Sequence, residues 1–314
     1  MGNQKRQKTA FVLEGGAMRG LYTAGVLDVF MQNEISTDAI YGVSAGALFG
    51  INFKSKQIGR AIRYNLKYAH EKNYMGLYSL ITTGNIMNKD FCFNKLVNKI
   101  DKFDFEAFDK SPIDFFAVVT NVETGKAEYI KITDSRYGLE ALRASGSMPF
   151  VSKCVEFEGS KYLDGAISDP IPVQKAIDDG YEKIIVVLTR PEGYKKHKKS
   201  MPYNFFYKKY PNFVNTAKKQ SEFYNSTLEL IKKYENEGKI FVLRPSLDLK
   251  IARVEKNLGK LTAIHQLGVA DCISNLDKIK SYLNTQAISN KIWTKKSLIL
   301  LTELGAKIIK IGDL

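Results

Sequence analysis

The sequence predicts an α/β fold with three layers, α/β/α, and a mostly parallel central sheet. Short apolar runs alternate with helical patterns, and this alternation is typical of parallel sheets that are covered by helices on both faces. Glycine-rich turns follow the first two apolar runs, as expected at the carboxyl edge where such sheets place their sites. The 314 residues are 44% hydrophobic, which is enough for a large buried core.

The N-terminal part of the chain reads as strand, glycine loop, helix, strand, sharp turn and helix. The apolar run 9–13 predicts a buried strand, and apolar residues at helical spacing predict a helix over 19–32. Residues 38–41 predict a second strand that enters the turn Gly42-Val43-Ser44-Ala45-Gly46, and a small-residue helix over 45–53 follows. We expect both glycine turns at one edge of the sheet.

The rest of the chain continues the same alternation. The segment 54–87 has helical spacing and is expected to cross the surface over the sheet, and its sequence carries no chemical information. Further strands are expected over 115–120, 127–132 (antiparallel to its predecessor), 183–189 and 239–244, and helices over 139–144, 173–179, 221–237 and 259–283.

Charge and cysteine content narrow the class of protein. Forty-seven Lys and Arg against 33 Asp and Glu give a formal net charge of +14, which favours nucleic acid, a membrane surface or phosphate-bearing substrates as partners. Cys92, Cys154 and Cys272 lie far apart and indicate neither a disulfide framework nor a zinc site. We find no signal-peptide pattern and no run of about 18 apolar residues. We expect a cytoplasmic protein.

Two basic segments lie in the C-terminal part. In residues 195–219, the basic aromatic block, lysines alternate with Tyr and Phe. We favour a solvated lysine face over buried aromatic rings; docking to anionic lipid headgroups is the alternative, and without a recognised module we expect no nucleic-acid binding. In residues 294–311, Leu and Ile recur at helical spacing among lysines, and we expect this helix to pack rather than to bind a membrane.

Ser44 is the candidate nucleophile. In a Gly-x-Ser-x-Gly elbow the serine occupies a sharp strand-to-helix turn, where Gly42 and Gly46 remove the Cβ atoms that would clash. The helix that follows directs its first amides at developing negative charge. Upstream, the loop Glu14–Gly20 can cradle an anion with its backbone amides, and a plain glycine turn is the alternative. Its spacing fits neither a dinucleotide fingerprint nor a P-loop.

Asp164 is the candidate base. It stands at the end of a predicted strand and is followed by Gly165, which tolerates unusual backbone angles. An ordinary Asp-Gly turn is the alternative, and it is the favoured interpretation of this segment taken in isolation. An aspartate is a weaker base than a histidine, so it needs burial and a short hydrogen bond to Ser44. A Ser-His-Asp triad would require His197 or His265. We favour the dyad, because all three histidines, at positions 70, 197 and 265, are expected to be solvated.

Four ordered segments resemble the bacterial patatin-like phospholipases: Glu14–Gly20, Gly42–Gly46, Ala144–Pro149 and Asp164–Ala166. The resemblance is strong over about residues 9–190 and extends weakly to about residue 283. It implies a serine-aspartate dyad acyl hydrolase that needs no metal and no cofactor. Ser44 would be the nucleophile, Asp164 the base, the amides of Gly15, Gly16 and Ala17 the oxyanion hole, and Arg19 the residue that fixes the loop.

Ala17 departs from the family pattern, which has a third glycine at this position. If the position requires a positive φ, alanine costs about 1 kcal/mol or more and can reshape the oxyanion hole. A weak or narrow activity would follow.

The resemblance implies a division of the chain and a function. We expect a patatin-like catalytic region over 9–190, a continuation of the same α/β domain over 191–283 and a basic amphipathic tail over 284–314. The predicted activity is hydrolysis of fatty-acyl esters or phospholipids by a serine esterase of lipid metabolism, with peripheral contact to anionic membranes held open. The alternative is a lipid-surface or regulatory binding protein with a vestigial site.

Overall fold

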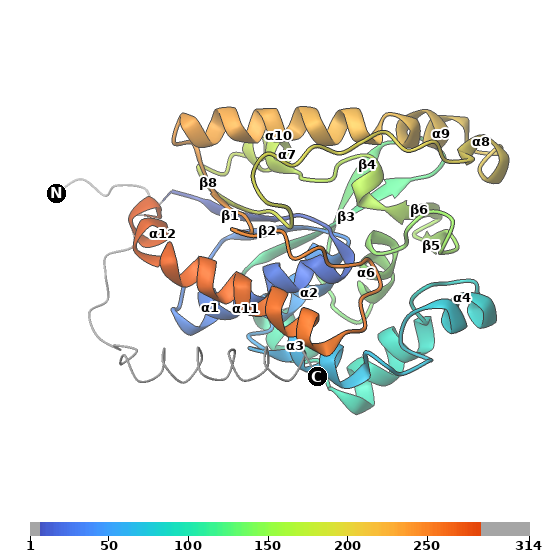
Figure 1. Ribbon diagram of the computed structural model, residues 1–314, viewed down its shortest axis with the longest axis horizontal. Helices are drawn as coiled ribbons and strands as arrows, with labels where there is room; N and C mark the ends of the chain where they lie inside the picture. The colour runs from blue at the N-terminus through green and yellow to red at the C-terminus, as the bar shows by residue number, and fades with distance from the viewer. Residues whose placement is uncertain (1–6, 284–314) are drawn as a thin grey trace.

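An eight-stranded sheet forms the middle layer of the computed structural model, which describes residues 7–283. The strand order is β5-β6-β3-β2-β1-β7-β8, and β4 pairs with β3. Helices cover both faces of this sheet (Figure 1). The predicted three-layer fold is confirmed. The tail predicted over 284–314, with its helix over 294–311, lies outside the described residues.

The centre of the sheet is parallel. Strands β3, β2, β1, β7 and β8 pair with one another in parallel, whereas β4, β5 and β6 are antiparallel additions beside β3. The strands span Thr9–Leu13 (β1), Ala39–Val43 (β2), Asp114–Asn121 (β3), Ala127–Lys131 (β4), Val155–Phe157 (β5), Ser160–Asp164 (β6), Lys183–Val187 (β7) and Ile240–Leu243 (β8). The strand β8 comes from the region expected over 191–283, which thus contributes to the same sheet.

One helical layer contains α1 (Leu21–Gln32), α2 (Ala45–Lys54), α3 (Arg60–Tyr68), α11 (Leu258–Ser274) and α12 (Leu276–Tyr282). Helices α1 and α11 cross at glycines: a Cβ atom on Gly25 would lie 2.2 Å from the carbonyl oxygen of His265, and one on Gly268 would lie 2.1 Å from that of Tyr22. This close crossing attaches the C-terminal helices to the layer that covers the elbow.

The opposite layer contains α7 (Val173–Asp178), α9 (Pro211–Lys218) and α10 (Gln220–Asn236), with the short α8 (Tyr203–Phe206) at one end (Figure 1). Val173 of α7 and Ile231 of α10 pack on Ala10 and Val12 of β1. Since alternate side chains of β1 point to opposite faces, Phe11 joins the core on the other side.

Some elements differ from their predictions. The helix expected over 259–283 is interrupted at Asn275, whose side-chain amide donates to the carbonyl of Asp271 at 2.9 Å, because asparagine competes with the helix for backbone partners. The segment 54–87 contains α3 and α4 (Leu77–Thr83), and α6 spans Leu139–Ser145. No residue pattern predicted β5, the π-helix η2 (Phe91–Ile100) or α5 (Phe105–Lys110).

No helix within residues 7–283 is long and apolar enough to cross a membrane.

Candidate active site

The turn between β2 and α2 has the geometry expected of the elbow. Ser44 has φ 54° and ψ −121°, outside the regions that L-residues ordinarily occupy. A Cβ atom on Gly42 would lie 2.6 Å from the Cα of Ala47, and one on Gly46 would lie 2.3 Å from the carbonyl oxygen of Leu13. The strained turn therefore requires glycine at both flanking positions.

Sheet register brings Asp164 to Ser44 although 120 positions separate them. Val43 pairs with Val118 of β3, and the next residue of β3, Val119, pairs with Asp164 at the end of β6. Ser44 Oγ donates a hydrogen bond to Asp164 Oδ2 at 2.7 Å, and both residues are buried. The strand β3 thus aligns the two side chains.

The electrostatic environment makes Asp164 more basic than an ordinary aspartate. Burial raises the pKa of Asp164 to about 6, opposed by hydrogen bonds from the amide of Ala166 and from Ser44 and by the charges of Lys196 and Arg253. The Ala166 amide donates to Oδ1 at 2.9 Å, which leaves Oδ2 directed at Ser44. Asp164 is therefore ionised at neutral pH and yet a usable proton acceptor.

The glycine loop after β1 lies directly against the elbow. A Cβ atom on Gly15 would come within 2.9 Å of the Cβ of Ser44, so only glycine permits this approach. Ala17 has φ 51°, so the strained conformation considered from the sequence is present. The amides of Gly15, Gly16 and Ala17 donate to no acceptor among residues 7–283.

Glu14 holds this loop in place, a role that we did not predict. Its Oε2 accepts from the Thr189 amide at 2.6 Å, and its Oε1 accepts from the Tyr224 hydroxyl at 2.6 Å. Thr189 Oγ1 also donates to the carbonyl of Gly15 at 3.1 Å. Burial raises the pKa of Glu14, and these hydrogen bonds oppose the rise. The end of β7 and helix α10 are thereby connected to the loop.

Arg19 follows in the short 3₁₀ turn η1 (Ala17–Gly20). Its backbone amide donates to the carbonyl of Gly16 at 3.1 Å, but its guanidinium Nε is buried and has no hydrogen-bond acceptor within the described residues. The predicted role of Arg19 in fixing the loop stays a prediction.

The small-residue loop 144–150 contacts both members of the pair. The amide of Ser44 donates to Ser145 Oγ at 2.8 Å, and the amide of Asp164 donates to the carbonyl of Ser147 at 2.8 Å. Gly165 packs on β3, where a Cβ atom would lie 2.3 Å from the carbonyl oxygen of Val118. The sequence contained this loop among its motifs without indicating that Ser145 supports Ser44.

A cavity of about 90 Å³ opens beside Ser44 and Ala17. Its walls are mostly apolar and come from α2, α3, η2, α6 and the loops between them, with side chains that include Leu48, Phe49, Ile51, Met75, Ile86, Met87, Phe93, Leu96, Leu142 and Met148. Segment 54–87, whose sequence carried no chemical signal, supplies part of this wall.

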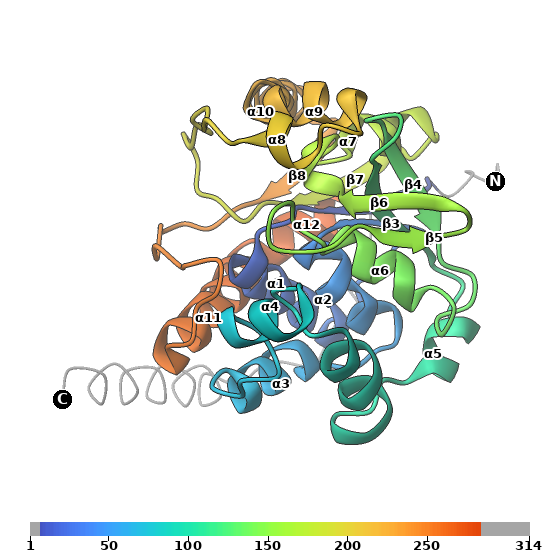
Figure 2. The ribbon, with the colours of Figure 1, turned by 90° about the vertical axis from the view of Figure 1, so that its right-hand side faces the viewer.

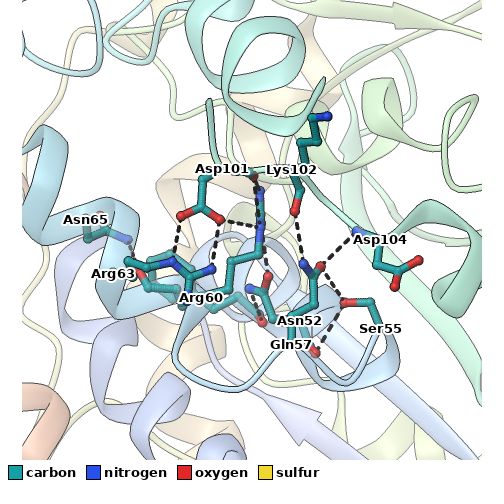
Figure 3. Close-up of polar contacts among 11 residues, drawn as sticks. Asn52, Ser55, Gln57, Arg60, Arg63, Asn65, Asp101, Lys102 and Asp104 are labelled. Carbon is teal, nitrogen blue, oxygen red and sulfur yellow. Dashed lines mark hydrogen bonds and ion pairs between the residues drawn. The ribbon is translucent and has the colours of Figure 1, made fainter. Parts of the chain in front are cut away.

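Polar contacts around Arg60 join α2, α3 and the segment after η2 (Figure 3). Arg60, which lines the cavity and is 2% exposed, donates from Nη1 to Asn52 Oδ1 at 3.0 Å and from Nη2 to the carbonyl of Asp101 at 2.6 Å. Its Nε also lies 3.2 Å from Asp101 Oδ1. Helix α2, which begins at the elbow, is thus tied to α3 and to the segment after η2.

No histidine is part of this arrangement. His70 and His197 are exposed, whereas His265 Nε2 lies 2.9 Å from Asp28 Oδ2 between α11 and α1. The expectation that all three histidines are solvated is therefore wrong for His265. In the described part of the chain, no group of three or more His, Cys, Asp or Glu could hold a metal ion.

The basic aromatic block is only partly as expected. Tyr203, Tyr207 and Phe213 are buried, but Phe205 and Phe206 are exposed. Lys196 is half-buried and its charge reaches Asp164, so it does not belong to a solvated lysine face.

Fold and site together place the chain among three-layer α/β proteins in which a serine elbow is hydrogen-bonded to an aspartate from a neighbouring strand. The model of the family described as patatin-like phospholipase matches residues 11–177, more than half of the 314 residues. The chain belongs to the patatin-like phospholipase family. Residues 210–284 also match a domain of unknown function (DUF6363).

The chain is also similar to several named proteins. The uncharacterized protein YjjU of Escherichia coli is 32% identical over 59% of this chain and 52% of its own length. Lysophospholipase NTE1 of Scheffersomyces stipitis is 27% identical over 58% of this chain and 12% of its own length. Among solved structures, VipD from Legionella pneumophila aligns with a TM-score of 0.44 and 12% identity over 87% of this chain and 67% of that chain. The chain matches about half of YjjU and a smaller part of NTE1.

Proposed function

We propose that the protein is a carboxylic ester hydrolase that cleaves lipid acyl esters with a Ser44–Asp164 dyad. The observation that carries this proposal is the 2.7 Å hydrogen bond from Ser44 Oγ, on a strained elbow, to the buried carboxylate of Asp164. A hydroxyl held against a carboxylate with a pKa of about 6 can be deprotonated as it attacks. Family membership supports the same chemistry.

In the first half-reaction, Ser44 Oγ attacks the ester carbonyl carbon while its proton passes to Asp164 Oδ2. Negative charge develops on the carbonyl oxygen, and the free amides of Gly15, Gly16 and Ala17 would stabilise it. When the tetrahedral intermediate collapses, the proton on Asp164 passes to the departing alcohol. The acyl group stays on Ser44 as an ester.

In the second half-reaction, water replaces the alcohol. Asp164 takes a proton from this water as its oxygen attacks the acyl carbon, and the same amides would stabilise the second tetrahedral intermediate. Collapse releases the carboxylic acid and returns the proton from Asp164 to Ser44. No metal or organic cofactor enters this scheme.

The apolar walls of the cavity support a fatty-acyl group as the part of the substrate that enters beside Ser44. Relatives named lysophospholipase support a phospholipid or lysophospholipid substrate. We propose that residues 9–190 carry the chemistry, with residues 191–283 completing the domain.

A fluorophosphonate probe and a panel of chromogenic esters and phospholipids test the proposal. Wild type should be labelled at Ser44 and should hydrolyse at least one ester. Ser44→Ala and Asp164→Asn should each hydrolyse that ester at least 1000-fold more slowly, as triad deletions do in other serine hydrolases. Ser55→Ala, a buried serine at the end of α2, is the matched control and should keep full activity. Absence of labelling in folded wild type would contradict the proposal.

Histidine variants separate the dyad from a triad. Because His265 pairs with Asp28 and His197 is exposed, His197→Ala and His265→Gln should each keep turnover within a few fold. A loss as large as that of Asp164→Asn in either variant would point to a triad instead.

We also propose that the protein is cytoplasmic and contacts anionic membranes peripherally. Leu77 and Ile81 of α4 and Phe205 and Phe206 of α8 are exposed apolar side chains. Both helices lie at the end of the molecule that faces the viewer in Figure 2. Apolar side chains with nearby lysines suit an anionic interface.

Vesicle sedimentation tests this contact. Ile81→Asp together with Phe205→Asp should weaken sedimentation with anionic vesicles, whereas Ile273→Asp on α11 should not. Equal binding of both variants would exclude this surface as the contact.

A lipid-surface binding protein with a vestigial site is the second candidate, and the strained Ala17 favours it. Binding to anionic vesicles without turnover of any ester would support this candidate. Turnover that depends on Ser44 would exclude it.

A further inference from the structure

Four cationic side chains converge beside the glycine loop and form what we call the cation cluster. It consists of Arg19 in η1, Arg190 after β7, Lys196 before α8 and Arg253 before α11. Their charges act on one another: after burial, Arg190 and Arg253 contribute to lowering the pKa of Arg19. Arg253 and Arg19 likewise add to the effect of burial that lowers the pKa of Lys196 to about 8.

In the described part of the chain, two guanidinium groups of the cluster have a buried donor without an acceptor. The Nε atoms of Arg19 and Arg190 are both buried, and neither has a hydrogen-bond acceptor among residues 7–283. Arg190 has one distant ion pair, Nη1 to Asp248 Oδ1 at 3.9 Å. Buried donors without acceptors are rare in proteins. These unsatisfied donors point to an anionic ligand with several oxygens.

The cluster adjoins the dyad. The charges of Lys196 and Arg253 act to lower the pKa of Asp164, against the larger effect of burial. Arg253 also lines the same cavity as Ser44 and Ala17. An anionic group held by the cluster could thus belong to the molecule whose ester lies at Ser44. The nearby carboxylate of Glu14 acts on Arg19 and Lys196 through its charge, while its oxygens accept hydrogen bonds from Thr189 and Tyr224.

The aromatic rings beside the cluster are covered by its own cations. The guanidinium of Arg190 lies 4.5 Å from the centre of the Tyr194 ring, and Lys196 Nζ lies 5.0 Å from the centre of the Tyr224 ring. A quaternary ammonium headgroup needs free aromatic faces. The surroundings thus favour an anion and disfavour a choline headgroup.

We propose that the cation cluster binds the phosphate of the substrate, and that the preferred substrate is an acyl ester with an unsubstituted, doubly charged phosphate group. Three carboxylates, Glu14, Asp164 and Asp248, stand near the four cations, which leaves positive charge in excess for a phosphate group. The donors of two guanidinium groups match phosphate oxygens in geometry. The proposal rests on the ester hydrolysis proposed above.

Hydrolysis of three lipids with one acyl chain tests the preference: an acylglycerol phosphate, an acylglycerophosphocholine and a monoacylglycerol. Wild type should show a kcat/KM at least tenfold higher for the acylglycerol phosphate than for either other lipid. Lys196→Gln and Arg253→Gln should each lower the ratio of kcat/KM for the phosphate lipid to that for the monoacylglycerol about tenfold or more, since hydrogen bonds to charged groups contribute about 1.5–3 kcal/mol. Lys199→Gln, an exposed lysine of the same loop, should keep the wild-type ratio.

A binding measurement keeps the two proposals separable. Calorimetry of the Ser44→Ala variant with glycerol 1-phosphate should show binding that the added Arg253→Gln substitution weakens about tenfold. If wild type hydrolyses no ester but this binding occurs, the hydrolase proposal fails and the phosphate site stands. If monoacylglycerol is hydrolysed but the ratio is unchanged in both cluster variants, the headgroup proposal is overturned. Binding of inorganic phosphate with no change in the lipid ratio would overturn it too, in favour of a free-phosphate site.

Discussion

Replacing Asp164 by asparagine should abolish ester hydrolysis and at the same time stabilise the folded protein at neutral pH. Asparagine has the same shape as aspartate, and its Oδ1 can still accept the hydrogen bond from the Ala166 amide. The substitution therefore removes the negative charge and the base while it leaves the packing at the end of β6 intact.

The expected stabilisation follows from the pKa. Burial raises the pKa of Asp164 from 3.8 to about 6, and each pKa unit corresponds to about 1.36 kcal/mol, so ionised Asp164 destabilises the folded state by about 3 kcal/mol. The sign follows from proton binding: between these two values the folded state holds the proton more tightly, and stability falls as pH rises. Below pH 3.8 the destabilisation is absent, and above the folded pKa it is complete.

Urea unfolding of wild type and Asp164→Asn at several pH values measures this effect. The difference in unfolding free energy should be small near pH 4 and should grow to about 3 kcal/mol by pH 7.5. Asp104→Asn is the control, because Asp104 caps α5 on the surface and asparagine caps as well as aspartate. A difference that does not grow with pH, or a variant less stable than wild type at pH 7.5, would refute the reasoning.

Three further outcomes are expected. Ester hydrolysis should fall tenfold per pH unit below about 6, as protonation removes Asp164 as a base, which a kcat/KM profile measures. Ala17→Gly should stabilise the protein by up to about 1 kcal/mol in urea unfolding, because glycine adopts φ 51° without strain. Tyr224→Phe should destabilise it by about 1–3 kcal/mol and lower kcat, because Glu14 loses the 2.6 Å hydrogen bond that satisfies its buried Oε1.

Each of these outcomes has a control. In Ser55→Ala, kcat/KM should fall with decreasing pH below about 6 as it does in wild type. A fall in the kcat/KM of wild type that begins only near pH 4 would contradict the raised pKa of Asp164. Ala61→Gly, in helix α3, should destabilise by about 1 kcal/mol, with a sign opposite to that of Ala17→Gly. Tyr234→Phe should change stability little, because that hydroxyl donates to Gln174 at an exposed position; an equal loss in Tyr224→Phe and Tyr234→Phe would argue against the role of Glu14.

The elements with strong local signals were predictable from the sequence. The apolar run of β1, the elbow at Ser44 and the antiparallel pair β3–β4 all appear where the residue pattern indicated them. Asp164 was named as the candidate base through the four ordered segments, because its own segment, taken alone, is typical of an ordinary Asp-Gly turn; its catalytic role stays a prediction. Periodicity and turn residues encode such features within a few positions of the chain.

Elements with weak local patterns were not predicted from the sequence. Strand β5 has three residues and the π-helix η2 follows no common spacing, so neither has a pattern that a short window can detect. The break at Asn275 depends on one side-chain hydrogen bond, which apolar periodicity does not report.

The sequence by itself determined which residues form the elbow, the glycine loop and the alternating strands and helices. Only the tertiary structure decided that Asp164 is buried against Ser44 with a raised pKa, that Glu14 holds the loop, and that Arg19 and Arg253 converge beside the dyad. The physical reason is strand pairing: β2 pairs in parallel with β3, and β6 pairs with β3 in the antiparallel direction, so residues distant in the chain meet where β2 ends. Burial, unsatisfied donors and charge proximity arise there and have no counterpart in local sequence.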